Sequence, residues 1–208
     1  MAKFVNNYLR IHERAIYRIF KYLISAKYCG IIYSPDPSLG LECFVDADFA
    51  GGWSQADADN VENVMSRTGF VLRYAGCPIR WCSKLQTEIA LSTAEAEYIA
   101  FSQVLREVIP LMTLLEELGE IYPLYKAKPD FICMVLEDNQ SCIAMTKYPK
   151  FIPRTKHISL KYHHFRSNVD SGKIKIIYNP SDEHIVDILT KPVNYPHFYV
   201  LRYLLMGW

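Results

Sequence analysis

Carboxylates stand where predicted strands of this sequence end and where predicted helices begin. They are Asp46 with Asp48, Glu97, Asp138 and Asp187. Neighbouring strand ends of an α/β sheet open on one crevice, so side chains this far apart in the chain can converge there. Each carboxylate raises the cost of ionising its neighbour, so such a group requires cations. Oxygen ligands without paired histidines or cysteines select Mg²⁺ or Mn²⁺ over zinc. Two such ions stabilise both the attacking and the leaving oxygen of a phosphodiester, so the pattern indicates phosphoryl transfer.

Each carboxylate also has an ordinary structural interpretation. Asp138 fits the N-cap of a following helix, and Glu97 and Asp187 fit solvated helix positions. Asp46 and Asp48 fit a turn after a strand. Spacing and periodicity alone leave both interpretations open and support no more than an unspecific α/β domain.

The elements that must position these residues form a predicted meander followed by α/β units. The expected strands are 41–49, two strands around a turn at 75–78, 131–136 and 173–178; the expected helices are 93–118, 141–147, 158–169 and 182–190. Pro110 should kink or divide the long helix, and the polar stretch 51–68 is expected to be a loop. The order predicts one mixed five-stranded sheet, with three antiparallel strands and then two parallel ones, flanked by helices.

Composition and the N-terminal segment limit the class of protein. With 208 residues, 50% of them hydrophobic and 22% charged, the chain suits one globular domain with a short appendage. Residues 11–26 have the spacing of an amphipathic helix. Residues 34–40 are rich in helix- and strand-breaking residues, which predicts a linker. No window reaches the roughly 18 consecutive apolar residues of a membrane span, so no membrane partner is expected. The six scattered cysteines fit reduced core residues of an intracellular protein.

Five strings give the sequence a specific resemblance to the ribonuclease H domain of copia-type long-terminal-repeat retrotransposon polyproteins. They are FVDADFAG (44–51), SRTGFVLRYAGCPIRWCSKLQTEIALSTAEAEYIA (66–100), LEDNQSCIAM (136–145), RTKHISLKYHHFR (154–166) and VDILTKPV (186–193), in the family's order and approximate spacing. Residues 2–33 resemble the end of the reverse transcriptase region. The resemblance implies a polymerase tail with linker at 1–40 and a ribonuclease H-like domain at 41–208. It also suggests a piece of a longer polyprotein.

The resemblance assigns roles to four carboxylates. Asp46, Glu97, Asp138 and Asp187 match the family's four acidic positions. They would hold two Mg²⁺ ions, with Mn²⁺ as a substitute, and the activity implied is endonucleolytic hydrolysis of the RNA strand of an RNA–DNA hybrid during reverse transcription. The expected partners are the hybrid and the rest of the polyprotein, in cytoplasmic virus-like particles and the nucleus.

Two positions of the family pattern need a choice. Glu95 and Glu97 both lie at the start of the long helix; the family usually has an alanine three residues after its glutamate, and Ala100 follows Glu97 whereas Tyr98 follows Glu95. Glu97 is therefore the predicted ligand. Cellular ribonucleases H also carry a histidine in the loop before the last helix. Only His184 lies near that loop here, and we expect it to be a surface residue and a poor substitute.

Substrate contacts are expected from two groups of residues. Between Asn139 and Val169 the chain has no acidic residue, which predicts a track for the phosphate backbone, although a solvated basic face is the alternative. Discrimination of RNA from DNA must use the 2′-hydroxyl, for which side chains beside the carboxylates are candidates. The candidates are Lys147, Arg154, Lys156, His157 and Lys161 for the backbone, and Ser92, Thr93, Asn139 and Gln140 for the 2′-hydroxyl.

Two other functions compete with cleavage. Degenerate domains of this fold in retroelement polymerases only hold nucleic acid or partner chains, and the missing loop histidine leaves room for weak activity or for such a tether. All four acidic positions are filled, which favours an enzyme. Integrase-type relatives fit poorly, because the acidic spacing and the flanking strings differ.

Overall fold

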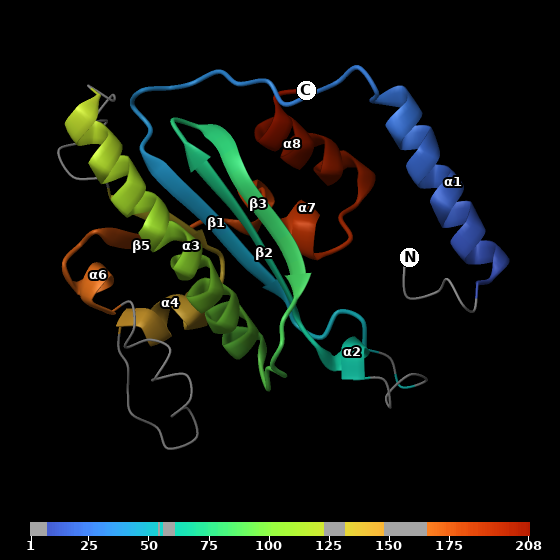
Figure 1. Cartoon of the computed structure of the whole chain (residues 1–208). Helices are drawn as coiled ribbons and strands as arrows, with labels where there is room; N and C mark the ends of the chain where they lie inside the picture. The colour runs from blue at the N-terminus through green and yellow to red at the C-terminus, as the bar shows by residue number, and fades with distance from the viewer. Residues whose placement is uncertain (1–7, 54, 56–60, 123–131, 148–165) are drawn as a thin grey trace.

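The computed structural model describes residues 8–53, 55, 61–122, 132–147 and 166–208 (Figure 1). Its elements are α1 (Arg10–Ser25), β1 (Leu41–Asp48), α2 (Val61–Val64), β2 (Arg67–Tyr74), β3 (Cys77–Leu85), α3 (Thr93–Ile121), β4 (Cys133–Glu137), α4 (Gln140–Lys147), α6 (Arg166–Asp170), β5 (Ile174–Tyr178), a 3-10 turn η4 (Ser181–Glu183), α7 (Asp187–Thr190) and α8 (Tyr195–Met206).

The five strands form one mixed sheet in the order β3-β2-β1-β4-β5. The pairs β1–β2 and β2–β3 are antiparallel, whereas β1–β4 and β4–β5 are parallel. The predicted turn between the second and third strands is a two-residue hairpin, in which Ala75 and Gly76 have positive φ angles of 51° and 75°. Such turns match the right-handed twist of the paired strands. The sheet expected from the sequence is thus confirmed.

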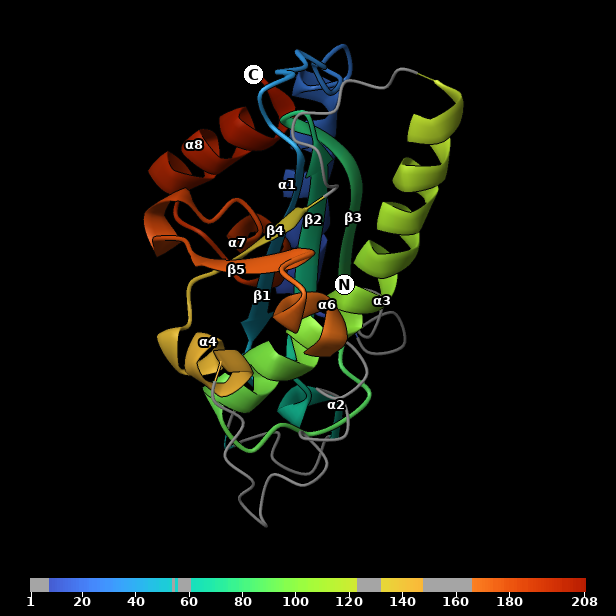
Figure 2. The same cartoon turned by 90° about the vertical axis from the view of Figure 1, so that its left-hand side faces the viewer.

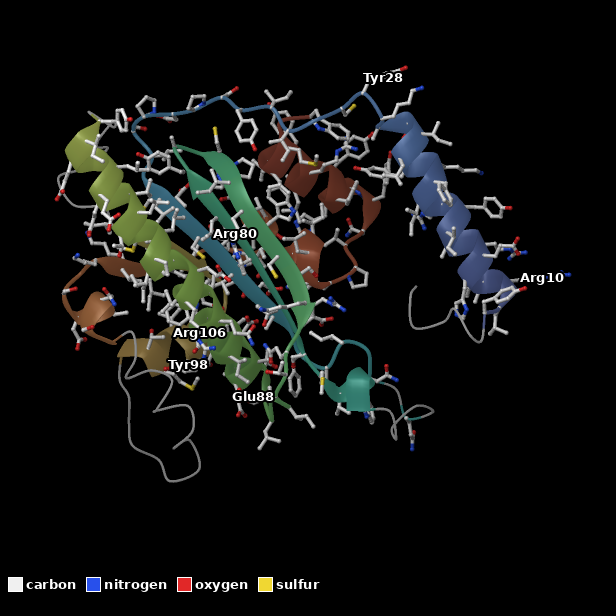
Figure 3. All side chains as sticks on the ribbon, viewed as in Figure 1. Arg10, Tyr28, Arg80, Glu88, Tyr98 and Arg106 are labelled. Atoms are coloured by element: carbon white, nitrogen blue, oxygen red, sulfur yellow. The ribbon has the colours of Figure 1, made fainter. Side chains whose placement is uncertain are left out.

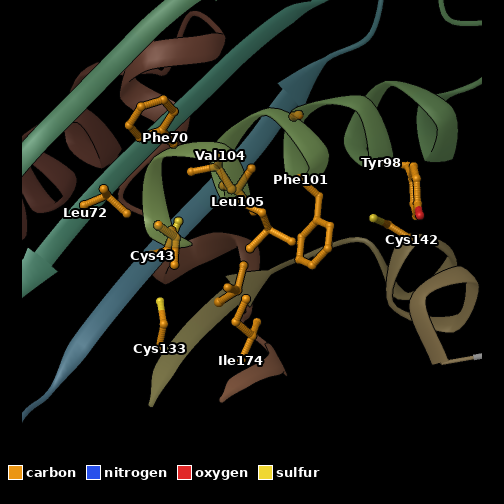
Figure 4. Close-up of a cluster of buried hydrophobic side chains, with 14 of the residues drawn as sticks. Cys43, Phe70, Leu72, Tyr98, Phe101, Val104, Leu105, Cys133, Cys142 and Ile174 are labelled. Carbon is orange, nitrogen blue, oxygen red and sulfur yellow. The ribbon is translucent and has the colours of Figure 1, made fainter. Parts of the chain in front are cut away.

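One face of the sheet is covered by α3, which packs on β1 and β2 (Figures 1 and 2). The main apolar core lies between them, and its largest enclosed side chains are Phe101, Tyr98, Leu105 and Leu72 (Figure 4). Of the two outcomes expected at Pro110, a kink or a division, the helix is not divided: it continues through Pro110, and its axis bends (Figure 2). By length and composition α3 is apolar enough to cross a membrane, but here it is the core helix of the fold.

The opposite face is covered by the short helices α7 and α8 (Figure 2). Its apolar cluster is small and is centred on Phe44, Val71, Ile185 and Val186. Two expectations are wrong here. Residues 182–190 are not one helix, because residues 184–186 separate η4 from α7. The expected loop 51–68 contains α2 and the start of β2.

The helix α1 buries none of its residues (Figure 3, from Arg10 toward Tyr28). Its contact with the rest of the protein includes the Tyr22 ring, which meets the edge of Phe198 on α8. The segment after it is held to the C-terminal helix by two hydrogen bonds, from Ile32 N to the Met206 carbonyl and from Trp208 Nε1 to the Gly30 carbonyl.

Candidate metal centre

The site lies where β1 and β4 part. Their parallel pairing runs from Leu41–Cys133 to Phe44–Leu136, and the chains diverge beyond it. Asp46 and Asp138 each follow two residues later, so both carboxylates stand in the gap between the strands. Asp46 is buried, and Asp138 is partly exposed and accepts a hydrogen bond of 2.9 Å from Ser181 Oγ. One oxygen of Asp46 and one of Asp138 lie within 4.8 Å of each other.

The N-terminus of α3 determines which glutamate reaches this gap. Ser92 is the N-cap and accepts from the Glu95 backbone N–H (3.2 Å), and the Glu95 carboxylate accepts from the Leu91 N–H (2.9 Å). These two bonds satisfy amide donors that a helix start leaves free. Glu97 lies further along the helix and accepts from the backbone N–H of Ala47 on β1. Of the two glutamates weighed from the sequence, the structure places Glu97 beside the strand ends.

A fifth carboxylate, which the sequence analysis missed, belongs to the same site. Glu137 is the last residue of β4 and is fully buried, and its Oε1 accepts from the Asn139 N–H (3.1 Å). Oxygens of Glu97, Glu137 and Asp138 lie within 4.8 Å of one another. The available signal was a carboxylate attached directly to an apolar strand, since glutamate is almost never fully buried without a partner.

Asp187 approaches Asp46 from the other face of the sheet. Lys191, one helical turn after Asp187, places its Nζ 3.0 Å from Asp187 Oδ1 and 3.4 Å from Asp46 Oδ1. The hydroxyl of Thr190 donates to the second oxygen of Asp46. The close approach of α7 requires Gly69, the partner of Asp46 on β2, because a Cβ there would meet Thr190 Cγ2 at 2.4 Å. Asp187 thus reaches the site, joined to Asp46 through Lys191.

Burial and mutual repulsion disfavour the charged forms of these groups. Loss of hydration, followed by the neighbouring Glu137, Asp46 and Asp138 carboxylates, raises the pKa of Glu97 to about 11. Burial also raises the pKa of Glu137, to about 8. The pKa of Asp187 is raised by burial and by Asp46, against the opposing effect of Lys191. Without a divalent cation, the centre holds protons that ordinary carboxylates would have released.

The buried oxygens of this site fit a metal. Glu97 Oε2 and Glu137 Oε2 are enclosed and have no hydrogen-bond partner among the residues that the structure describes. Buried acceptors without a partner are costly, and a cation between them would satisfy both. The donors are all oxygen, which suits Mg²⁺ or Mn²⁺ rather than zinc. The residues present therefore fit a divalent cation.

His184 is a correction to the sequence analysis, because it is fully buried and not on the surface. Its Nε2 lies 2.8 Å from the Val45 carbonyl, which can only accept, so Nε2 carries the proton. Its Nδ1 then accepts from the Asn179 side-chain amide at 3.1 Å. A ring nitrogen lies within 4.8 Å of oxygens of Asp46 and Asp138, but both nitrogens are already occupied. His184 fixes the segment before α7 to β1.

The proposed substrate-contact residues have mixed placements. Asn139 Oδ1 caps α4 by accepting from the Cys142 N–H (3.0 Å), so Asn139, not Asp138, is the N-cap. Ser92 caps α3, and Thr93 and Gln140 are exposed at the first positions of α3 and α4. Lys147 is the last residue of α4, and its side chain is not described. Arg154, Lys156, His157 and Lys161 lie outside the described residues.

The strand order, three antiparallel strands followed by two parallel ones with α3 across the sheet, defines a ribonuclease H-like fold. Comparison with known proteins then places the chain more narrowly. It is 35% identical over 194 residues to the "Retrovirus-related Pol polyprotein from transposon TNT 1-94" of Nicotiana tabacum. The aligned region is 93% of this chain and 13% of that protein. It is 29% identical over 194 residues to the corresponding polyprotein "from transposon RE1" of Arabidopsis thaliana, covering 93% of this chain and 12% of that protein.

The homologues of this chain are therefore retrovirus-related Pol polyproteins of copia-type transposons, and the chain spans about an eighth of their length. No protein-family model matches it. Among solved structures it is similar to LC11-RNase H1, isolated from compost by a metagenomic approach, with a TM-score of 0.49 and 15% identity over 73% of this chain and 92% of that one.

Proposed function

We propose that this domain is a divalent-metal-dependent endonuclease that hydrolyses the RNA strand of RNA–DNA hybrids formed during retrotransposon reverse transcription. The observation that carries the proposal is the convergence of Asp46, Glu97 and Asp138, with Asp187 joined to Asp46, in a chain whose homologues are Pol polyproteins. Carboxylates gathered from β1, α3, the end of β4 and α7 are suited to hold Mg²⁺ or Mn²⁺.

Each residue has a distinct part in this proposal. Asp46 and Asp138 face each other across the gap between the strands and would be the central ligands. Glu97 and Asp187 would complete the coordination from opposite faces of the sheet. When bound, the cations supply an activated water and stabilise the departing oxygen. Thr93 and Gln140, which are exposed at the first positions of α3 and α4, would contact the hybrid.

A cleavage assay with strand-specific labels tests the proposal. We expect the wild-type chain to cut the RNA of a hybrid in Mg²⁺ or Mn²⁺, to stop in EDTA, and to leave a DNA duplex intact. Asp138→Asn should abolish cutting while preserving hybrid binding. The matched control is Asp182→Asn, which changes an exposed carboxylate on η4 and should cut like the wild type. Normal cutting by Asp138→Asn, or equal cutting of duplex DNA, would refute the assignment.

One observation favours a second candidate function, a nucleic-acid tether without efficient cleavage. Both oxygens of Asp46 are already engaged, one by Thr190 and the other by Lys191. A ligand with both oxygens taken binds an incoming ion less strongly. Binding of the hybrid with no strand cut at any tested concentration of Mg²⁺ or Mn²⁺ would select this candidate.

A further inference from the structure

The carboxylates of the centre fall into two halves that differ in how their charge is balanced. We name Asp46 and Asp187, with Lys191 and Thr190, the paired half, and Glu97, Glu137 and Asp138 the open half. The division follows the sheet, because the paired half lies on the α7 side and the open half at the junction of α3 with β4. The two halves meet at the gap between β1 and β4.

In the paired half an ammonium group occupies the space between two carboxylates. Lys191 Nζ is 3.0 Å from Asp187 Oδ1 and 3.4 Å from Asp46 Oδ1. Both distances are within the range of an ion pair, so the ammonium group offsets negative charge where a cation would bind. About a third of the side chain is exposed (36%), so a path to solvent is open to it.

The open half is balanced less directly, because the charge of Lys191 acts on Glu137 and Asp138 without forming an ion pair with either. Within the part of the chain that the structure describes, Glu97 and Glu137 form no ion pair with lysine or arginine. In the same described ranges their Oε2 atoms are enclosed without a hydrogen-bond partner, and the two residues are 3% and 0% exposed. One oxygen from each of Glu97, Glu137 and Asp138 lies within 4.8 Å of the others, a spacing that one oxygen-coordinated cation can bridge.

We propose that the two positions of this centre load in a fixed order, the first divalent cation binding the open half through Glu97, Glu137 and Asp138. Lys191 holds the place of a second cation between Asp46 and Asp187 and leaves it only when that cation enters. The inference rests on the proposed function for its purpose and deepens it, because it assigns Glu137 as a ligand and Lys191 as an internal cation of the same site.

The order follows from electrostatics. A cation entering the open half meets three carboxyl groups with no ammonium group in ion-pair contact among the described residues, and it satisfies two oxygens that have no hydrogen-bond partner there. A cation entering the paired half must first displace an ammonium group that already neutralises one charge there, and it must break the contact of Lys191 with each aspartate. Since like charges repel across these short distances, the second ion binds more weakly for as long as Lys191 remains in place.

The test counts bound Mn²⁺ by electron paramagnetic resonance on the full chain, without nucleic acid. Wild-type protein is expected to bind one Mn²⁺ at least tenfold more tightly than a second. Glu137→Gln should weaken the first ion at least tenfold. Lys191→Met should strengthen the second ion at least tenfold and change the first less, whereas Lys191→Arg, which keeps the charge, should keep the second ion weak.

Matched controls come from exposed ion pairs outside the site. Lys173→Met removes an ammonium group paired with Glu116, and Glu107→Gln removes a carboxylate paired with Arg80. Both should bind Mn²⁺ as the wild type does. Circular dichroism melts identify any variant that fails to fold, and the comparison of Lys191→Arg with Lys191→Met among folded proteins still decides the question.

Three results would overturn the proposal: two ions of equal affinity in the wild type, a first ion unaffected by Glu137→Gln, or a second ion equally weak in Lys191→Met and Lys191→Arg. These outcomes are independent of catalysis. A chain that loads Mn²⁺ in the expected order yet cuts no hybrid refutes the proposed function and leaves the loading order standing. A chain that cuts hybrid but loads two equal ions refutes only the loading order.

Discussion

The two faces of the sheet differ in what they do for the protein. The α3 face encloses the large apolar cluster, with Phe101, Val104 and Leu105 fully buried. The α7 face has a cluster of four buried side chains, and polar contacts to Asp46 hold α7 in place. The difference teaches that the α3 face supplies most of the buried apolar surface and also presents Glu97 to the site, whereas the α7 face contributes mainly polar contacts that position Asp46 and Asp187.

The largest effect should come from a change at the meeting point of both faces. Asp46→Asn removes the charge of the central carboxylate while keeping its shape, and we expect hybrid cleavage to fall at least 1,000-fold, a barrier increase of about 4 kcal/mol. Single-turnover rates in Mn²⁺ measure it. The melting temperature should not fall with the rate; a parallel loss of folding would mean that Asp46 serves stability instead.

A truncation in the α3 core should lower stability and leave the cleavage rate of the folded protein nearly unchanged. Phe101→Ala is expected to lower the free energy of unfolding by about 3–5 kcal/mol, because it removes a buried ring and leaves a cavity. Urea titration measures the loss. Well below the melting temperature, the Mn²⁺ affinity and cleavage rate per folded molecule should stay within about twofold of the wild type. A large fall in either would show that the two faces are not separable.

The stability of the metal-free chain should depend on pH through the open half. The pKa of Glu137 is raised from 4.5 to about 8, so between these values the folded state keeps a proton that the unfolded chain has released. The free energy of unfolding therefore falls as the pH rises through this window, by about 3 kcal/mol from pH 5 to pH 8. Glu97, raised further, acts in the same direction.

Urea titrations in EDTA at successive pH values measure this slope. Glu137→Gln should reduce it, and saturating Mn²⁺ should reduce it as well, because the cation favours the ionised carboxylates. A stability that rises over the same window would contradict the burial of Glu137 as a protonated group.

A methyl group added between β2 and α7 should modestly lower both the stability and the cleavage rate. In Gly69→Ala the new Cβ would meet Thr190 Cγ2 at 2.4 Å, so α7 must shift. We expect a loss of about 1–3 kcal/mol in stability and a clear fall in cleavage rate, measured on the same preparation. Gly40→Ala is the control, since the atom nearest to a Cβ added there is the Ile132 carbonyl oxygen, at 3.8 Å. Equal behaviour of the two variants would argue against the close approach.

The smallest effect is expected at Glu95. Glu95→Gln keeps an oxygen for the Leu91 N–H, so stability should change by less than about 0.5 kcal/mol and cleavage should remain near the wild-type rate. Glu97→Gln, two residues away, should lose most of the cleavage. Reversed results for the two glutamates would exchange their assignments.

Local patterns predicted the sheet, because alternation, turn residues and helix spacing are properties of neighbouring residues. The hairpin at Ala75 and Gly76 and the strand order follow from them. Lys191 was missed, although its position four residues after Asp187 was visible, because its contact with Asp46 depends on how α7 packs. Glu137 was passed over in favour of Asp138 for the same reason: which of two adjacent carboxylates is enclosed is decided by tertiary structure.

The burial of His184 could not be predicted from the residues around it in the sequence. A histidine in a polar run beside Asp182 and Glu183 fits a surface position by local composition. In the structure it follows the 3-10 turn η4 and precedes α7, where one helix was expected over 182–190. Its burial depends on two partners, the Val45 carbonyl and Asn179, and Val45 is 139 residues away in the chain. A contact of that range leaves no trace in the local pattern.

The exposure of α1 bears on how much this helix contributes to the stability of the sheet domain. Because none of its residues is buried, undocking it uncovers little apolar surface, and hydrophobic free energy scales with the area removed from water. We therefore expect the unfolding of the sheet domain to depend little on α1, whose ring contact with the domain is that of Tyr22 with Phe198. The segment after α1 is held by two hydrogen bonds, one between Ile32 and Met206 of α8 and one between Gly30 and Trp208. These two bonds fix the point from which α1 extends.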